Sequence, residues 1–151
     1  MIFDRTQNDV DTAILIRSEK VQNFETLTES EIATLEKGTL TINTLNRIEN
    51  KQSELKNLFD EMGYWTTDIT NKVWEYSDIF KPEEFDRILS NLDVLKKAFF
   101  VYNDTPKIPS NNYRNFHVIN DVEKILYDLD VMINDIKSHY RECGTFECGE
   151  E

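Results

Sequence analysis

The sequence predicts an all-α protein, a helical bundle of about five helices that forms a single helical domain over residues 1–151. Only 4 Gly and 3 Pro occur in a chain that is 39% hydrophobic, which argues against both disorder and a turn-rich β architecture. Apolar residues recur at spacings of three and four, and no stretch alternates with a period of two. The periodicity is lost in an irregular aromatic insert at 64–80 and in a short non-helical tail at 141–151.

The first two helices are marked by capping boxes. Thr6 with Asp9 predicts a helix over about 7–21, and Thr28 with Glu31 predicts a second one. The second helix can only be short, because Lys37-Gly38 closes it. The apolar stripe of the first helix consists of Val10, Ile14, Val21 and Phe24.

The third helix completes the N-terminal helices, which we assign to residues 1–63. It should start near Thr41 or Asn43, extend for about 20 residues and stop at Gly63. Its stripe consists of Leu45, Ile48, Leu55, Phe59 and Met62, with Gln52 in the same pattern. This stripe predicts a long amphipathic helix that faces the core.

The aromatic insert at 64–80 carries few helix signals. Tyr64, Trp65, Trp74 and Tyr76 lie in it. Aromatic residues clustered in an irregular segment are either caps over one end of a core or anchors of a protein interface, and the sequence leaves both readings open.

The second half, 81–140, is predicted to be a helical hairpin with a proline-containing linker. Pro82 at the first helical position, followed by Glu83 and Glu84, begins a fourth helix. Its stripe consists of Phe85, Ile88, Leu92, Leu95 and Phe99. Two prolines in 104–110 predict an extended linker, because proline disfavours helix in the residue before it.

The last helix, over about 115–140, is the longest predicted element and the one around which the others should pack. Its stripe consists of Ile119, Val122, Leu126, Leu129, Ile133, Ile136 and Tyr140. On the opposite side, Asp121, Asp128 and Asp135 repeat every seven residues, which predicts an acidic ridge that faces water.

Charge and hydropathy exclude several partners. The chain has 17 basic and 29 acidic residues, a net charge of −12, which disfavours binding to nucleic acid and to anionic membrane surfaces. The apolar runs are too short to span a bilayer. The N-terminal residues lack the pattern of a secretory signal, so we expect synthesis in a reducing cytoplasm.

Residues that could carry chemistry are few. Cys143 and Cys148 with His139 could bind zinc, but structural zinc takes four ligands, so we predict no metal. A disulfide between the two cysteines is geometrically possible, but a reducing compartment disfavours it, so we predict two free thiols. His117 has no recognisable nucleophile beside it. Phosphate-binding loops and hydrolase or metalloprotease motifs are absent from the sequence. We therefore expect a protein without a cofactor that is not an enzyme.

Several segments resemble one protein family. These are FDRT at 3–6, TLNRIEN at 44–50, Trp74 with Asp78-Ile79, RILSNL at 87–92, the proline linker, and NDVEKILYDLD at 120–130. Together they resemble small tail-region structural proteins of Firmicutes phages and prophages. The resemblance covers most of the chain. It implies a virion component, or a component of a phage-tail-like particle, that is not an enzyme. The resemblance leaves the position in the particle open, and we expect the baseplate or the fibre attachment.

This resemblance and the aromatic residues together give the functional hypothesis. The protein would be a structural component of a phage tail that binds other tail, baseplate or fibre proteins, and a homo-oligomer within the particle is left open. The candidate interface residues are Tyr64, Trp65, Trp74, Tyr76 and Phe146. The alternative is an acidic helical inhibitor or DNA mimic that binds a basic protein through the ridge; its affinity would fall steeply with salt.

Overall fold

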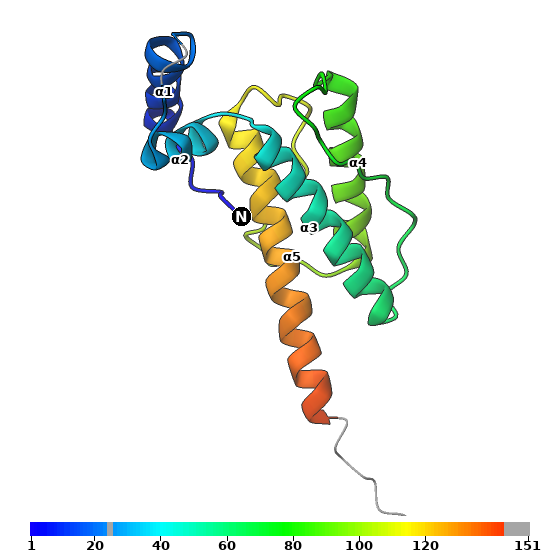
Figure 1. The fold of residues 1–151 in the computed structure, drawn as a ribbon. Helices are drawn as coiled ribbons and strands as arrows, with labels where there is room; N and C mark the ends of the chain where they lie inside the picture. Colours follow the sequence, from blue (N-terminus) through cyan, green and yellow to red (C-terminus); the bar gives the residue numbers. More distant parts are fainter. Residues whose placement is uncertain (24–25, 144–151) are drawn as a thin grey trace, which may run out of the picture.

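The computed structural model describes residues 1–23 and 26–143, and within them every regular element is helical (Figure 1). The prediction of an all-α protein is confirmed. The helices are α1 (Gln7–Ile16), α2 (Glu29–Gly38), α3 (Ile42–Glu61), α4 (Pro82–Ala98) and α5 (Phe116–Cys143), with a π-helical stretch η1 (Arg17–Val21) after α1. The first predicted helix is therefore α1 together with η1.

The helix ends follow the local signals in the sequence. The Thr6 hydroxyl accepts from the backbone N–H of Asp9, whose carboxylate accepts from Thr6 N–H, and Thr28 and Glu31 form the same reciprocal pair. Both predicted capping boxes are thus confirmed. After α3, Gly63 has a φ of +79°, a left-handed conformation that favours glycine and ends the helix.

Helices α3, α4 and α5 form the core and run parallel to one another (Figure 1). Contacts between α3 and α5 follow the same order in both helices: Arg47 with Glu123, Lys51 with Asp130, and Glu61 with Lys137. The fully buried large side chains come from all three helices: Ile48, Gln52, Leu55, Phe59, Phe85, Ile88, Leu92, Leu95, Ile125, Leu126, Leu129 and Ile133.

The parallel arrangement differs from the hairpin expected for 81–140. Phe99 stacks on Phe59 at the C-terminal end of α4, with ring centroids 5.1 Å apart, whereas Tyr113 packs on Phe85 at the N-terminal end of α4. The linker therefore travels back along α4 before α5 begins. A helix of 17 residues is about 26 Å long. An extended linker of this length can span that distance, whereas a helical hairpin needs only a short loop.

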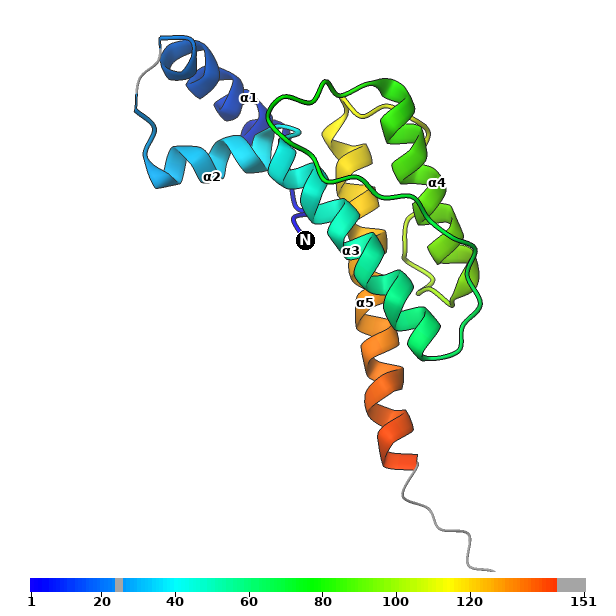
Figure 2. The ribbon, with the colours of Figure 1, turned by 45° about the vertical axis from the view of Figure 1, so that its right-hand side comes forward.

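The N-terminal hairpin, which we define as α1, η1 and α2, stands beside the core instead of joining it (Figures 1 and 2). The buried core cluster includes no residue of α1 or α2. Ala13 is buried against Gly38, where a Cβ atom would lie 2.5 Å from that of Ala13. The close approach therefore requires glycine. Ile14 and Val21, which were expected to face a shared core, are exposed.

The apolar stripe predicted for the last helix faces the core, but the acidic ridge predicted on its opposite side does not face water along its whole length. Ile119, Val122, Leu126, Leu129 and Ile133 are buried, Ile136 is half-buried, and the side chain of Tyr140 lies outside the described part. Of the ridge, Asp135 is exposed, Asp121 is half-buried and Asp128 is buried. Asp128 is covered because the linker crosses this face: the Thr105 hydroxyl donates to its carboxylate at 2.7 Å, and Lys124 pairs with it. The predicted ridge is therefore wrong at its centre.

The predicted start of the tail at residue 141 is wrong. Residues 141–143 belong to α5, and residues 144–151, including Phe146 and Cys148, lie outside the described residues.

Candidate protein interface

The aromatic insert runs along the core instead of covering one end of it. After α3 it returns as an extended segment, residues 64–81, that crosses α3 and α4 on the way to the start of α4 (Figure 2). Tyr64 packs on Phe59 near the end of α3, and Phe80 packs on Phe85 near the start of α4. Both ends of the insert are therefore fixed by aromatic contacts with the core.

Two asparagines hold the backbone of the insert. Asn46 of α3 accepts from the Trp74 N–H at 2.8 Å and donates to the Trp74 carbonyl at 3.0 Å. Asn91 of α4 makes the same pair of hydrogen bonds with Thr70: it accepts from the Thr70 N–H at 3.3 Å and donates to the Thr70 carbonyl at 2.8 Å. A side-chain amide can pair with both the N–H and the carbonyl of one residue. Each asparagine therefore supplies the hydrogen bonds that a neighbouring strand would otherwise give to an extended segment.

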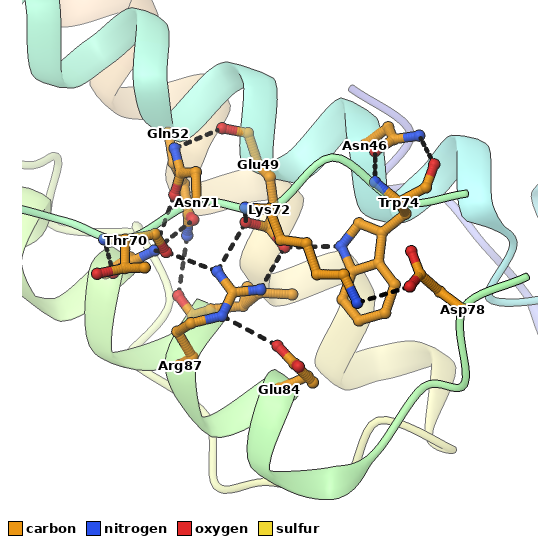
Figure 3. Close-up of polar contacts among 12 residues, drawn as sticks. Asn46, Glu49, Gln52, Thr70, Asn71, Lys72, Trp74, Asp78, Glu84 and Arg87 are labelled. Carbon is orange, nitrogen blue, oxygen red and sulfur yellow. Dashed lines mark hydrogen bonds and ion pairs between the residues drawn. The ribbon is translucent and has the colours of Figure 1, made fainter.

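Glu49 of α3 is the centre of the same network (Figure 3). Its carboxylate is 1% exposed and accepts two hydrogen bonds from Arg87 of α4, at 2.6 and 2.7 Å. It also accepts from the Trp74 indole and from the Lys72 backbone N–H, both at 2.7 Å. The hydrogen bond to Glu49 raises the pKa of Arg87 above its ordinary value. A buried carboxylate with four donors is fully paired, so this arrangement fixes α3, α4 and the insert relative to one another.

The network divides the predicted interface residues into two groups. Trp74 is 3% exposed and belongs to the core, and Tyr64 is half-buried between Phe59 and Phe99. Trp65 and Tyr76 are each 92% exposed. Phe146 is not among the described residues. Of the five predicted residues, the structure thus places two in solvent, on the same segment.

Two further exposed hydrophobic residues of the insert were not singled out from the sequence. Val73 and Ile79 are 77% and 78% exposed, and they flank the buried Trp74 and the half-buried Phe80. Alternation in an extended segment directs neighbouring side chains to opposite sides, which is the signal that could have identified them. We call Trp65, Val73, Tyr76 and Ile79 the insert face.

A second buried ion-pair cluster joins the N-terminus to α5. Glu123 is fully buried and accepts from Arg5 at 2.5 Å and from Arg47 at 2.8 Å. Asn120 accepts from Arg5 N–H and donates to the Arg5 carbonyl. The side chain of Arg5 is 2% exposed, and its Nη2 atom has no hydrogen-bond partner within the described part of the chain.

The described residues offer little for metal or membrane chemistry. His117 and His139 are both exposed, and no group of three or more His, Cys, Asp or Glu side chains in residues 1–23 and 26–143 is placed to hold a metal ion. None of the helices in that part of the chain is long and apolar enough to cross a membrane. The insert face is the clearest feature for recognition, because it gathers four exposed hydrophobic side chains on one segment.

Comparisons of the chain with protein-family models, with curated proteins and with solved structures found no match. The resemblance to phage tail-region proteins therefore stays a prediction.

Proposed function

We propose that this chain is a non-enzymatic structural component of a phage tail or phage-tail-like particle, and that it binds a neighbouring baseplate or fibre protein through the insert face. The observation that carries the binding role is the exposure of Trp65 and Tyr76, each 92%, on a segment whose backbone is fixed to the core. The assignment to a phage tail rests on the resemblance of the sequence.

The energetics of association favour such a surface. Tryptophan and tyrosine are the residues most often found as anchors of protein interfaces, because each buries a large area with few rotatable bonds. Binding normally costs entropy when a loop becomes ordered. Here Asn46 and Asn91 already fix the backbone between the two exposed rings, so binding a partner should cost less conformational entropy in the insert.

The test is co-assembly of Trp65→Ala and Tyr76→Ala with purified tail components, together with the melting temperature of each variant. We expect each substitution to weaken assembly by about 2 kcal/mol or more, as at an interface anchor, and to leave the melting temperature nearly unchanged. Leu15→Ala is the matched control, because Leu15 is also exposed but belongs to α1 and not to the insert.

Trp74→Ala provides the opposite comparison. Trp74 is buried and bonded to Glu49, so its loss should lower the melting temperature strongly. Unchanged assembly by both Trp65→Ala and Tyr76→Ala would overturn the proposed face.

The same assay separates the acidic-inhibitor alternative. The ridge that would imitate DNA phosphates has its central carboxylate, Asp128, buried. An interface built on Trp65 and Tyr76 should depend weakly on ionic strength, whereas binding of a basic protein should fall steeply as salt rises. A steep salt dependence would favour the alternative.

A further inference from the structure

A groove lies between the insert, the start of α3 and the residues before α5. Its volume is about 380 Å³, which is in the range of ligand-binding pockets. The apolar part of its lining consists of Leu40, Ile42, Leu45, Trp74, Phe80 and Tyr113. The groove is therefore suited to an apolar or aromatic side chain.

Arg114 gives the groove a positive end, and Arg5 lies in the cavity beside it. Arg114 is exposed and lines the groove, and within the described residues it makes no ion pair; its guanidinium contacts only the Tyr113 ring, 5.7 Å from the ring centre. A smaller cavity of about 60 Å³ shares Tyr113 and Arg114 with the groove and is also lined by Arg5. The buried Nη2 atom of Arg5 lacks an acceptor among the described residues, and a buried donor without an acceptor is costly.

The one acidic side chain in the described lining does not cancel this charge. Asp78 lies 3.0 Å from Lys72 and accepts from the Glu75 N–H at 2.8 Å. Its carboxylate is therefore already paired. Arg114 remains available to a ligand, whereas Arg5, which pairs with Glu123 through Nη1, offers only its Nη2 donor. The lining therefore matches an occupant that carries both an aromatic ring and carboxylates.

We propose that the occupant is residues 144–151 of a second copy of this chain, with Phe146 in the apolar part of the groove and the glutamates of the segment at Arg114 and Arg5. This segment reads GTFECGEE: one aromatic ring, three carboxylate side chains and no basic residue. The ring and the negative charges match the apolar lining and the positive end of the groove.

The contact must form between copies. Ile119 lines the smaller cavity at the start of α5, and 24 helical residues separate it from Cys143, a distance of about 36 Å. Phe146 lies three residues beyond Cys143 and can reach only about 10 Å from the end of the helix. Figures 1 and 2 show the two ends of α5 on opposite sides of the molecule. A chain therefore cannot fill its own groove with Phe146.

Such a contact joins two different surfaces of identical chains. Head-to-tail contacts of this kind generate closed rings or open filaments, not two-fold dimers. The inference does not depend on the insert face or on a phage tail, because purified protein alone should self-associate.

The experiment is sedimentation equilibrium of the full chain, under reducing conditions so that Cys143 and Cys148 cannot cross-link, from about 1 µM to about 1 mM. Wild-type protein should form oligomers beyond the dimer. Phe146→Ala should weaken the association constant by about 30-fold and Arg114→Glu by about tenfold or more. Both variants should keep the wild-type circular dichroism and melting temperature, because Arg114 is exposed and makes no ion pair among the described residues.

Mixing the two variants is the decisive step. Phe146→Ala retains an intact groove and Arg114→Glu an intact segment, so an equimolar mixture should form heterodimers that do not grow further. The proposal is overturned if wild-type protein stays monomeric over the whole concentration range, if either variant associates as strongly as the wild type, or if the mixture forms no heterodimers. Loss of association in Phe146→Ala alone would mean that the segment binds a different surface.

Discussion

Two segments of similar length bring the chain back between parallel helices, and they are held in different ways. Residues 64–81 return from α3 to α4, and residues 99–115 return from α4 to α5. Each segment gives one ring to an aromatic cluster at either end of the core. One cluster is Phe59, Tyr64 and Phe99, and the other is Phe80, Phe85 and Tyr113.

The two segments differ between these clusters. The insert is bound by the buried Glu49–Arg87 pair and by an asparagine on each neighbouring helix. The linker is held by single side-chain bonds: Thr105 donates to the buried Asp128 carboxylate at 2.7 Å, and exposed Asn111 donates to the Pro82 carbonyl at 2.9 Å and to Asp86 at 2.8 Å. Aromatic clusters thus fix where each return segment starts and ends. Of the two segments, only the insert has residues, Thr70 and Trp74, whose backbone N–H and carbonyl both pair with one asparagine side chain in the described structure. These paired bonds fix the backbone that carries the exposed residues of the insert.

The largest expected effect comes from removing the charged partner at the centre of the insert network. Arg87→Ala leaves the Glu49 carboxylate buried without its two strongest donors, so unfolding free energy should fall by about 3 to 5 kcal/mol. The corresponding change on the linker side, Lys96→Ala, removes a hydrogen bond to the Pro106 carbonyl without leaving a buried carboxylate stripped of its two arginine bonds, and it should cost under about 1.5 kcal/mol. Urea denaturation measures both.

A double substitution checks the cause. Glu49→Met with Arg87→Met removes the buried charge together with its partner, and apolar replacement of buried ion pairs is often close to neutral. The double variant should therefore be more stable than Arg87→Ala. If Arg87→Ala and Lys96→Ala lowered the unfolding free energy equally, the insert and the linker would be held equally strongly, and the proposed difference between them would be wrong.

A matched pair of asparagines gives an intermediate effect. Asn91 is buried and pairs with both backbone groups of Thr70, whereas Asn111 is exposed. Asn91→Ala should cost about 1 to 3 kcal/mol, because it leaves the Thr70 N–H and carbonyl without their partner. Asn111→Ala should stay within about 0.5 kcal/mol, as surface substitutions usually do. Faster hydrogen exchange at the Thr70 amide only in Asn91→Ala would place the loss in the insert.

The sequence predicts those parts of the fold that depend on neighbouring residues. The capping boxes at Thr6 and Thr28, the stop at Gly63 and the start at Pro82 all rest on hydrogen bonds or conformations within a few residues of each other, and all appear in the structure. The stripe of α5 is predictable for the same reason, since helical spacing alone determines which side chains share a face.

Features that depend on distant segments could not be predicted in this way. Asp128 looks like a surface residue until the linker crosses it, and the direction of α5 depends on that same path. Trp65 and Trp74 have similar surroundings in the sequence, but only Trp74 reaches Glu49, 25 residues earlier in the chain. Among the polar residues of the insert network, Asn46 and Glu49 lie in 44–50, and Arg87 and Asn91 lie in 87–92. These are two of the segments on which the predicted resemblance to phage tail-region proteins rests.

The smallest expected effect concerns the turn after Trp74. The Asp78 carboxylate accepts from the Glu75 N–H at 2.8 Å and lies 3.0 Å from Lys72, and these contacts, the backbone bond first, hold the pKa of Asp78 below its ordinary value of 3.8. With a lowered pKa, the folded protein binds fewer protons than the unfolded chain in mild acid. The stabilisation is therefore present above pH 3.8 and is lost as the pH falls through the lower folded pKa.

In the insert, the Glu75 amide should lose protection against hydrogen exchange below about pH 3.8, after correction for the intrinsic rate. Asp78→Asn carries no carboxylate, so its Glu75 amide should be less protected at neutral pH and should change little in acid. In the linker, the turn closed by the Thr105 N–H and the Tyr102 carbonyl, 3.1 Å apart, uses a backbone bond and provides the internal reference. NMR-detected exchange measures both turns in one sample. If the Glu75 amide of the wild type stayed as protected in acid as at neutral pH, the side-chain anchoring would end at Trp74, and the rest of the insert would be held no differently from the linker.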